Sequence, residues 1–558
     1  MNFPRQTARP PADMLFPFDH AHDRPPRELV AVLGGKGAGL AEMTTVLGLP
    51  VPAGFTIGVP VCRAYRETGW PEGLEAALDR QCRALEQRMG RSVGGASDPL
   101  LLAVRSGAPR SMPGMLDTVL NLGLNPAAVS GLAETSGDAR FAWESYRRFL
   151  TMYATTVLGV PAERLRRGGR DRVGPARVDE LRAEVDGILV ALAEDELSIP
   201  LDPMAQLRGA VEAVFRSWDS PRARAYRAHE GIAEDLGTAV NVQAMVFGNV
   251  DDDSGTGVVF TRDPSTGEAV AYGDFLPKAQ GEEVVAGTAH TLTVDAMGKL
   301  LPDAYDELRH HLRRLEIHYR DLCDVEFTVE RGRLWILQTR VGKRGAVAAV
   351  RAAVEMVDDP DIALSPEEAV ARVPADVRDR ARAEVLAAGR HASASSVPIA
   401  TGLGASPGRV TGAVVLDADA AADAVGPVIL VRPETSPEDV HGMSVSVGVL
   451  TSTGGLVSHA AVVARGWGIP AVVGAGSLVI GPDGVGQPDG TPLFGAGDVI
   501  TIDGTTGQVW LGQPDEEMPI AESDDEILRR HLPQLAQLER WAQAGGTLAG
   551  RALAVSEA

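Results

Sequence analysis

The sequence predicts a multidomain protein of mixed α/β and α+β class, and three features lead to this prediction. The chain of 558 residues is long enough for two to four domains. Glycine-rich turns alternate with helical and strand-like stretches over residues 29–345, as in large α/β or α+β units. Residues 401–512 instead have short apolar runs separated by recurring glycines, which indicates a second, compact β/α domain.

The other segments connect or extend these two domains. Residues 346–400 begin with Ala, Arg, Glu and Val at helical spacing, which predicts linker helices, and they include the serine-rich stretch 392–397, which we interpret as a hinge. Residues 1–28 are expected to form an N-terminal tail. Residues 513–558 are expected to form a helical C-terminal tail that starts with acidic residues.

The composition argues against several classes of function. The formal net charge of −22, from 53 Lys and Arg against 75 Asp and Glu, disfavours nucleic-acid partners and anionic membranes, because both require excess positive charge. No apolar stretch approaches the roughly 18 residues of a membrane span, and the N-terminus lacks the apolar core of a secretory signal. Cys62, Cys82 and Cys323 follow no metal-ligand pattern, so a reduced, cytoplasmic compartment is expected.

The first candidate for chemistry is the segment from Leu33 to Leu40, in which four glycines surround Lys36. A loop of this composition lets backbone N–H groups approach phosphates while the lysine supplies positive charge. The segment lacks the spacing of a P-loop, Gly-x4-Gly-Lys-Ser/Thr, so a tight turn with an exposed lysine is the alternative.

Residues 104–118 form a second candidate, which combines Arg105 and Arg110 with Gly107, Gly114 and the hydroxyls of Ser111 and Thr118. Arginine binds phosphate through two parallel hydrogen bonds, so this segment predicts a loop that covers phosphates. The alternative is a surface turn whose arginines pair with acidic residues.

The third candidate is a strand whose polar residues alternate with apolar ones. Asp324 and Glu326 fall on one face, and Val325 and Phe327 on the other. Two neighbouring carboxylates suit Mg²⁺, which prefers one or two carboxylates plus substrate oxygens. The alternative is a solvent-facing strand with cross-strand ion pairs.

A hairpin would bring further groups to this strand. If residues 331–333 form a three-residue loop, Gln338 lies opposite Glu326, and Arg340 lies opposite Asp324. The two carboxylates, an amide and a guanidinium would then converge on one place.

The compact domain contains one histidine in an informative setting. His459 follows the glycines Gly454 and Gly455 and precedes an apolar run that predicts a helix closed by Gly466. His459 would then begin the helix with Ser458 as its N-cap, where free N–H groups and the helix dipole favour a phosphoryl group on the imidazole. The alternative is a hydrogen-bonded histidine at the edge of a core.

This segment resembles the phosphohistidine segment of the phosphoenolpyruvate-utilising enzymes, above all pyruvate phosphate dikinase. The likeness runs nearly from end to end of the chain, and the candidates before it resemble the ATP-grasp nucleotide-binding domain of that family. Further similar segments are residues 141–149, 213–218, 237–248, 254–262, 279–287, 405–408 and 431–439.

The resemblance implies a role for each candidate residue. It assigns His459 as the phosphocarrier and assigns ATP or phosphate binding to Lys36, Arg105, Arg110, Gln243, Gln338 and Arg340. It assigns Mg²⁺ binding to Asp324 and Glu326, and supporting roles to Gly454, Gly455, Ser458 and Arg465.

The family reaction, if it applies here, uses ATP and inorganic phosphate to place the β-phosphoryl group on the histidine and releases AMP and pyrophosphate. The family then swings its β/α phosphohistidine domain to a distant site, where phosphohistidine and phosphoenolpyruvate interconvert with pyruvate. The resemblance therefore implies Mg²⁺ as cofactor and ATP and phosphate as substrates. It also allows a homodimer.

The sequence departs from the family in two respects. The family continues into a C-terminal (β/α)8 barrel of about 250 residues, whereas this sequence ends at Ala558, so we expect that barrel on a separate protein. Many family members carry a regulatory threonine two residues before the histidine, where this chain has Val457. Valine cannot be phosphorylated, so regulation by that route is not expected at this position.

Three functions are compatible with the sequence. We predict a phosphotransferase that phosphorylates its own His459 and passes the group to pyruvate or phosphoenolpyruvate chemistry on a separate barrel subunit. A transferase to another small molecule is disfavoured, because the interval between Arg344 and Ser406 has no room for an acceptor domain. A non-catalytic ATP-binding regulatory module is disfavoured because none of the candidate residues is missing.

Overall fold

The computed structural model describes residues 13–110, 112, 115–165, 177–286, 291–390, 397–482, 484–514 and 523–556. Ser111, nearly all of the predicted hinge and the acidic start of the C-terminal tail lie outside these residues. The chain divides into two units. Unit 1 contains Met1–Asp251 with Trp335–Thr339, and unit 2 contains Asp252–Leu334 with Arg340–Ala558.

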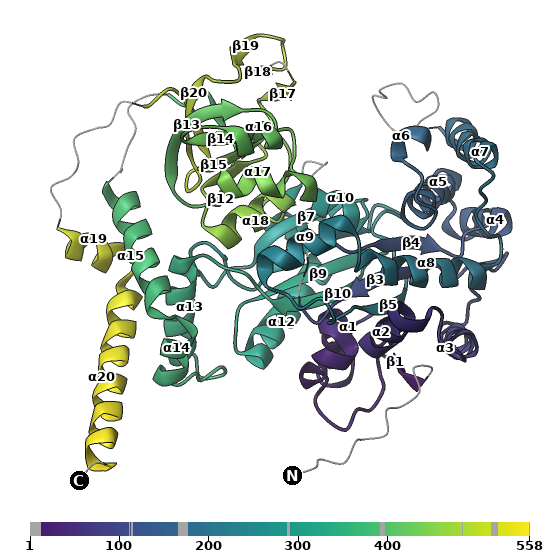
Figure 1. Cartoon of the computed structure of the whole chain (residues 1–558), viewed down its shortest axis with the longest axis horizontal. Coiled ribbons are helices and arrows are strands. Elements are labelled where there is room, and N and C mark those ends of the chain that lie inside the picture. The colour runs from purple at the N-terminus through teal and green to yellow at the C-terminus, as the bar shows by residue number, and fades with distance from the viewer. Residues whose placement is uncertain are drawn as a thin grey trace. The chain divides into compact units, whose positions relative to one another are not determined.

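Unit 1 is built on a five-stranded sheet of order β1-β2-β5-β3-β4 (Figure 1). Its described pairs are all antiparallel. The strands are β1 Leu15–Pro17, β2 Gly54–Ile57, β3 Leu102–Gly107, β4 Thr118–Leu122 and β5 Ala239–Ala244. The helices are η2 Pro26–Glu28, α1 Val30–Thr45, α2 Val59–Thr68, α3 Leu74–Met89, α4 Pro126–Ser136, α5 Ala139–Thr156, α6 Ala162–Leu165, α7 Val178–Glu194, α8 Pro203–Ser217 and α9 Pro221–Glu230.

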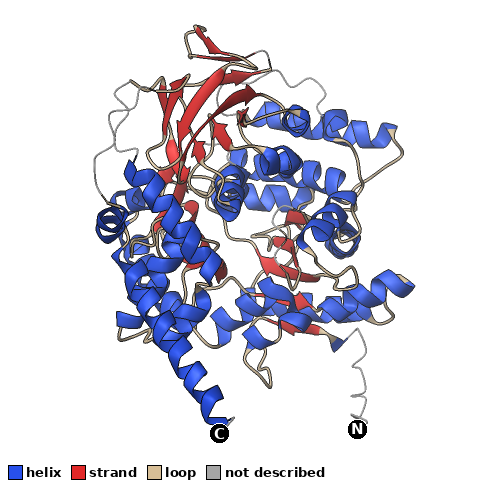
Figure 2. Cartoon of the chain, turned by 60° about the vertical axis from the view of Figure 1, so that its left-hand side comes forward, coloured by secondary structure: helices blue, strands red, loops and turns tan. Residues whose placement is uncertain are grey.

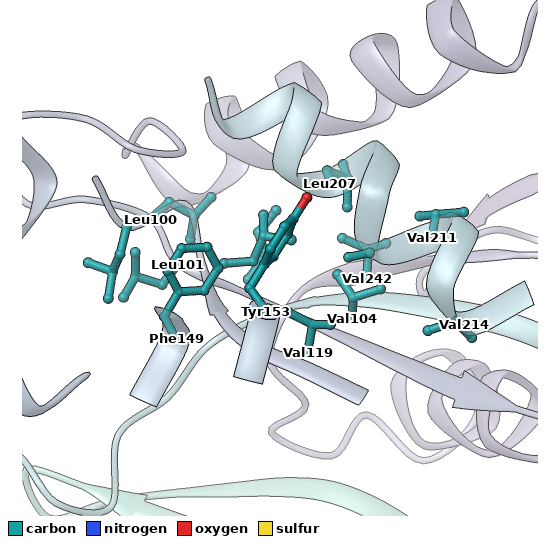
Figure 3. Close-up of a cluster of buried hydrophobic side chains, with 14 of the residues drawn as sticks. Leu100, Leu101, Val104, Val119, Phe149, Tyr153, Leu207, Val211, Val214 and Val242 are labelled. Atoms are coloured by element: carbon teal, nitrogen blue, oxygen red, sulfur yellow. The ribbon is translucent and has the colours of Figure 1, made fainter. Parts of the chain in front are cut away.

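The core of unit 1 lies between this sheet and its helices. Helix α5 begins at Asp138, whose carboxylate accepts from two backbone N–H groups, and its apolar stripe turns toward the sheet. Figure 3 shows Phe149 and Tyr153 of this helix among leucine and valine side chains of the strands and of α8. The core residues are nearly inaccessible to water. Their close packing holds the strands in place and so fixes the positions of side chains at the strand ends.

Unit 2 begins with a five-stranded sheet of order β10-β9-β6-β7-β8. Its strands are β6 Gly255–Phe260, β7 Tyr272–Pro277, β8 Leu292–Thr293, β9 Cys323–Glu330 and β10 Arg333–Val341, and its helices are α10 Gly281–Ala286, α11 Val294–Leu300 and α12 Pro302–Tyr319. The loop between β9 and β10 has two residues, not the predicted three. Arg331 and Gly332 have φ of 52° and 74°, and positive φ at both central residues is typical of the tight type I′ hairpin.

The predicted linker helices are present and are joined by the C-terminal helices. They are α13 Ala346–Asp358, α14 Pro366–Arg372, α15 Ala375–Arg390, α19 Asp524–His531 and α20 Pro533–Ser556. Figure 2 shows α20 running beside the preceding helices to the C-terminus. Ile527, Leu535 and Leu538 complete one hydrophobic cluster with alanines and valines of α13 and α15.

The β/α domain of unit 2 has an eight-stranded sheet of order β11-β21-β20-β13-β14-β15-β16-β12, in which β13 to β16 are parallel. The strands are β11 Ala400–Thr401, β12 Leu403–Ser406, β13 Arg409–Val415, β14 Val428–Arg432, β15 Gly448–Thr451, β16 Ala471–Val473, β20 Val499–Asp503 and β21 Gln508–Leu511. A small sheet adds β17 Val479–Gly481, β18 Gly484–Gly486 and β19 Pro492–Phe494. The helices are α16 Ala418–Asp423, η3 Pro437–Asp439, α17 Val440–Val445 and α18 His459–Trp467.

The structure confirms the mixed α/β character of the chain. Within the described residues, no helix has both the length and the apolar character needed to cross a membrane. No group of three or more His, Cys, Asp or Glu side chains forms a metal site in the same residues.

Candidate functional site

The segment around Lys36 is not the open loop that the sequence predicts. Residues 35–45 belong to α1, and only Gly34 departs from helical geometry, with φ of 69°. A Cβ atom at Gly34 would overlap the carbonyl oxygen of Gly107 on β3, and one at Gly37 would collide with Thr56 and Asn241. The glycines therefore let α1 lie directly against the strands. Lys36 consequently sits in the first helical turn after the kink, half-buried.

Arg105 and Gln243 lie on neighbouring strands beside this kink. Arg105 on β3 pairs with Asn241 on β5, and Ala103 pairs with Gln243. A Cβ atom at Gly107 would come 3.3 Å from the Cβ atom of Lys36, so the lysine and the end of β3 are adjacent. Unit 1 thus brings Lys36 and the strand of Arg105 together, as the resemblance implies.

Two buried amides in unit 1 have atoms without hydrogen-bond partners among the described residues. These atoms are Asn241 Nδ2 and Gln338 Oε1. Asn241 accepts from Thr56 Oγ1 at 2.8 Å through its other end, while Gln243 Nε2 donates to the carbonyl of Pro52 at 3.2 Å. Unpaired buried polar atoms are costly, and a bound polar ligand or water would satisfy them.

Arg110 is exposed at the end of the arginine segment. Beyond it, Met112 and Met115 are buried in a cluster with Trp218 and Ala223. Asp117 is bound by Arg222 at 2.5 Å, so the far end of this segment is anchored while Arg110 projects from it.

The two candidate carboxylates of β9 lie in unit 2. Asp324 is 5% exposed, and Arg340 Nε donates to both of its oxygens at 2.8 and 2.7 Å. Burial raises the pKa of Asp324 to about 6, with Arg340 opposing and the Glu326 carboxylate adding to the shift. The predicted contact between Asp324 and Arg340 is therefore present despite the shorter hairpin loop.

These residues fit a magnesium ion in the chemistry of their donors. Asp324 and Glu326 are two residues apart and lie on the same face of β9, where they offer hard oxygen ligands side by side. Burial is the main cause of the raised pKa of Asp324, and the neighbouring Glu326 carboxylate adds to it.

His459 is the first residue of α18, and Ser458 is its N-cap, as the sequence predicts. Ser458 Oγ accepts from Ala461 N at 3.5 Å. The helix ends two residues later than predicted, because Gly466 keeps a helical conformation and Gly468, with φ of 69°, forms the left-handed cap.

The imidazole of His459 is held through one nitrogen. Its Nδ1 lies 3.0 Å from Thr435 Oγ1, which comes from the loop after β14. Burial lowers the pKa of His459, against the opposing effect of the carboxylates of Asp439 and Glu438. His459 is therefore neutral at pH 7, with Nδ1 engaged.

The residues around His459 are closely packed. Gly454 has φ of 90°, which favours glycine, and Gly455 lies against Asp274 and Thr291, where a Cβ atom would overlap both. Arg465 is 3% exposed and donates to the carbonyls of Ala405 and Leu456, each at 3.1 Å. The supporting residues thus hold the loop that precedes the histidine.

Sequence reasoning did not single out Thr435, Asn241 or Asp274. Thr435 and Asn241 are buried polar residues inside segments that resemble the family. Their polar character within those segments was the sequence signal that could have identified them. Asp274 lies on a strand with no distinctive motif, and only the tertiary structure brings it to the histidine loop.

Two families of known proteins match this chain. Residues 64–299 and 293–360 match the family described as "Pyruvate phosphate dikinase, AMP/ATP-binding domain", and residues 425–507 match "PEP-utilising enzyme, mobile domain". The chain therefore belongs to the pyruvate phosphate dikinase family.

Similar curated proteins carry the same name. The chain is 48% identical over 507 residues to pyruvate, phosphate dikinase of Rhizobium meliloti. The matched region covers 86% of this chain and 56% of that protein. It is 43% identical over 518 residues to the Clostridium symbiosum protein, with 89% and 58% covered. It is also 43% identical over 553 residues to the chloroplastic protein of Flaveria pringlei, with 95% and 56% covered. The chain thus spans a little over half the length of these relatives.

Proposed function

We propose that this chain is an ATP-dependent phosphotransferase that uses ATP and phosphate to phosphorylate His459 on Nε2, with release of AMP and pyrophosphate. The observation that carries this proposal is the contact between His459 Nδ1 and Thr435 Oγ1 at 3.0 Å, at the N-terminus of α18. When Nδ1 carries the proton and donates it to the hydroxyl, the lone pair of Nε2 is free to attack phosphorus.

The proposed transfer has two steps, and in each step one bond to phosphorus forms while another breaks. Nε2 forms a bond to the β-phosphorus of ATP while the bond to the AMP oxygen breaks. Inorganic phosphate then takes the γ-phosphoryl group and leaves as pyrophosphate, so the β-phosphoryl group stays on His459. The positive end of the α18 dipole stabilises the negative charge beside the imidazole.

Charged and amide side chains would hold the nucleotide. Lys36, Arg105 and Arg110 would supply positive charge to the phosphates, and the buried amides of Gln243 and Gln338 would supply polar contacts. Asp324 and Glu326 would hold Mg²⁺, which neutralises phosphate charge when it is bound. Arg340, which binds Asp324, would orient that carboxylate.

The later steps extend the same proposal. We infer that residues 29–345 have the ATP-grasp fold and that residues 401–512 swivel to deliver the phosphoryl group to pyruvate, which becomes phosphoenolpyruvate while His459 is released unmodified. The family membership supports the chemistry of this acceptor. The separate subunit, a homodimer and a cytoplasmic location stay predictions.

Labelling of the protein tests the first step. Wild type, His459→Ala and the exposed control His441→Ala would be incubated with phosphate, Mg²⁺ and ATP labelled in the β- or the γ-position. We expect acid-labile β-label on wild type and His441→Ala only, with γ-label recovered in pyrophosphate. ATP binding without label on any variant would contradict the proposal and leave a regulatory ATP-binding module.

A test of acceptors addresses the later step. Labelled wild-type protein would be mixed with pyruvate, alone and together with the barrel portion of a relative. Transfer of label to phosphoenolpyruvate only in the second mixture is expected. Transfer in neither mixture would point to another acceptor.

A further inference from the structure

The loop before His459 meets a buried carboxylate from the first sheet of unit 2. Asp274 Oδ2 on β7 accepts from the backbone N–H of Val457 at 2.9 Å. Asp274 is 1% exposed, and the N–H of Leu456 and the hydroxyl of Thr291 also bind its carboxylate. A carboxylate at such depth is costly, and these donors offset that cost together with the positive charge of Arg465.

A guanidinium holds the same loop from its other side. Arg465 donates from Nη2 to the carbonyl of Leu456, and it also bonds to the side chain of Tyr272, the residue two before Asp274 on β7. Its guanidinium carbon lies 5.8 Å from the ring centre of Phe260 and 5.9 Å from that of Tyr272. The N–H and the C=O of one residue, Leu456, are therefore held by opposite charges.

The side chain of Val457, the residue after Leu456, packs against apolar residues of β6 and neighbouring elements. Val457 is 4% exposed and clusters with Val258 and Phe260 of β6, with Val284 of α10 and with Leu322. Burial removes the apolar surface of this valine from water, so this contact adds to the polar ones. Gly455 completes the fit, because any side chain there would overlap Asp274 and Thr291.

The strand register shows why this place matters. Val258 of β6 is paired with Asp274 on one side and with Glu326 on the other. Directly paired residues point to the same face of a sheet, so the carboxylate that receives the loop shares a face with the carboxylates assigned to Mg²⁺. The two positions are two strands apart, about 10 Å.

We propose that Asp274 and Arg465 form a clamp that seats the segment Gly455–Val457 on the β6–β7 face, and that both are positioning residues for phosphoryl transfer to His459. This inference rests on the function proposed above. The clamp acts on the loop backbone and not on the imidazole of His459. The clamp would fix the distance between His459 and the nucleotide phosphates. The rate of phosphoryl transfer depends steeply on this distance.

Two variants test the clamp from opposite sides. Asp274→Ala removes the acceptor of the loop amides, and Gly455→Ala places a methyl group where Asp274 and Thr291 lie. The matched controls are Asp306→Asn, an exposed carboxylate on α12, and Gly466→Ala, whose Cβ atom has room at 3.7 Å from Lys343. A third variant, Arg465→Lys, keeps the charge but loses the two-pronged geometry.

The first measurement is amide hydrogen exchange, which does not depend on activity. We expect protection of the Leu456 and Val457 amides to fall at least tenfold in Asp274→Ala and Gly455→Ala and to stay unchanged in both controls. Unchanged protection in the two test variants would overturn the clamp. A wild type that protects these amides but takes no label would disprove the proposed function and leave the clamp standing.

The second measurement is the initial rate of β-label transfer to His459 at varied ATP concentration. We expect the maximal rate to fall at least tenfold in the two test variants, with the KM for ATP unchanged, and to fall less in Arg465→Lys than in Arg465→Met. A rise in KM alone would show that these residues act on nucleotide binding, which also contradicts the proposal.

Discussion

Asp324 on β9 and Asp274 on β7 are two buried carboxylates on one face of one sheet, yet they are stabilised in different ways. Burial raises the pKa of both groups. Asp324 is paired with the guanidinium of Arg340, whereas Asp274 accepts from the backbone amides of the histidine loop. The first partner is a positive charge on a side chain, and the second consists of neutral donors, two of which are backbone N–H groups of the loop.

The difference teaches how one sheet can serve two purposes. The carboxylate beside a guanidinium and a second carboxylate, Glu326, is suited to bind Mg²⁺ next to phosphate. A carboxylate held by loop amides is suited to recognise a backbone conformation. We therefore expect Asp324 to affect Mg²⁺ binding and the transfer step directly. We expect Asp274 to affect the transfer only through the position of the histidine loop, and the following experiments separate the two effects.

The largest effect is expected for Asp324→Asn. Loss of one of the two charges assigned to Mg²⁺ should slow labelling of His459 at least about 100-fold, the size seen when one electrostatic group is removed from a transition state. The rate would be measured over a range of Mg²⁺ concentrations, with Asp306→Asn as the control. A rate within twofold of wild type would break the assignment of Asp324 to the chemistry.

Asp274→Asn sharpens the same comparison. If Asp274 acts on the loop alone, its neutral variant should label more slowly but with the Mg²⁺ dependence of wild type. The half-saturating Mg²⁺ concentration of the two variants, measured side by side, decides the point. A shift in that concentration for Asp274→Asn would mean that both carboxylates serve the metal.

A smaller effect is expected for Thr435→Val, which removes the partner of His459 Nδ1 at similar volume. The loss of one hydrogen bond, about 0.5–1.5 kcal/mol, should slow labelling roughly three- to tenfold. Thr453→Val is the control, because its hydroxyl binds the carbonyl of Pro433 in the neighbouring loop instead. Equal effects of both substitutions would indicate a general loosening of the loops.

The protonation of His459 can be followed by NMR on protein with labelled histidine, assigned with His459→Ala. Burial lowers the pKa of His459, so its titration should have a midpoint below the ordinary 6.5. Because the folded state then binds this proton less readily than the unfolded state, His459 should lower stability as pH falls below about 6.5. A midpoint at or above 6.5 would contradict the lowering of this pKa by burial.

The smallest effect is expected for Ser458→Ala. Loss of an N-cap costs about 0.5–2 kcal/mol, and the 3.5 Å contact to Ala461 N places this one at the low end. The midpoint of thermal unfolding should fall by a few degrees at most. A large loss would mean that Ser458 does more than cap α18.

The sequence alone predicted several elements of the site. Glycines before His459 and alanines after it were sufficient for a helix start with Ser458 as cap, because caps and local apolar runs depend on neighbouring residues. The alternation at Asp324 predicted a strand, and the predicted contact with Arg340 is present, although the three-residue loop from which we inferred it has two residues.

Other features were decided only by the tertiary structure. The glycines beside Lys36 predicted a loop, but α1 continues through them because they allow it to pack on β3 and β5. Thr435 reaches His459 from another strand end, and Asp274 reaches Val457 from another sheet. Such contacts join residues far apart in the chain, so no local pattern of the sequence carries them, and only the folded arrangement of the strands brings their atoms within bonding distance.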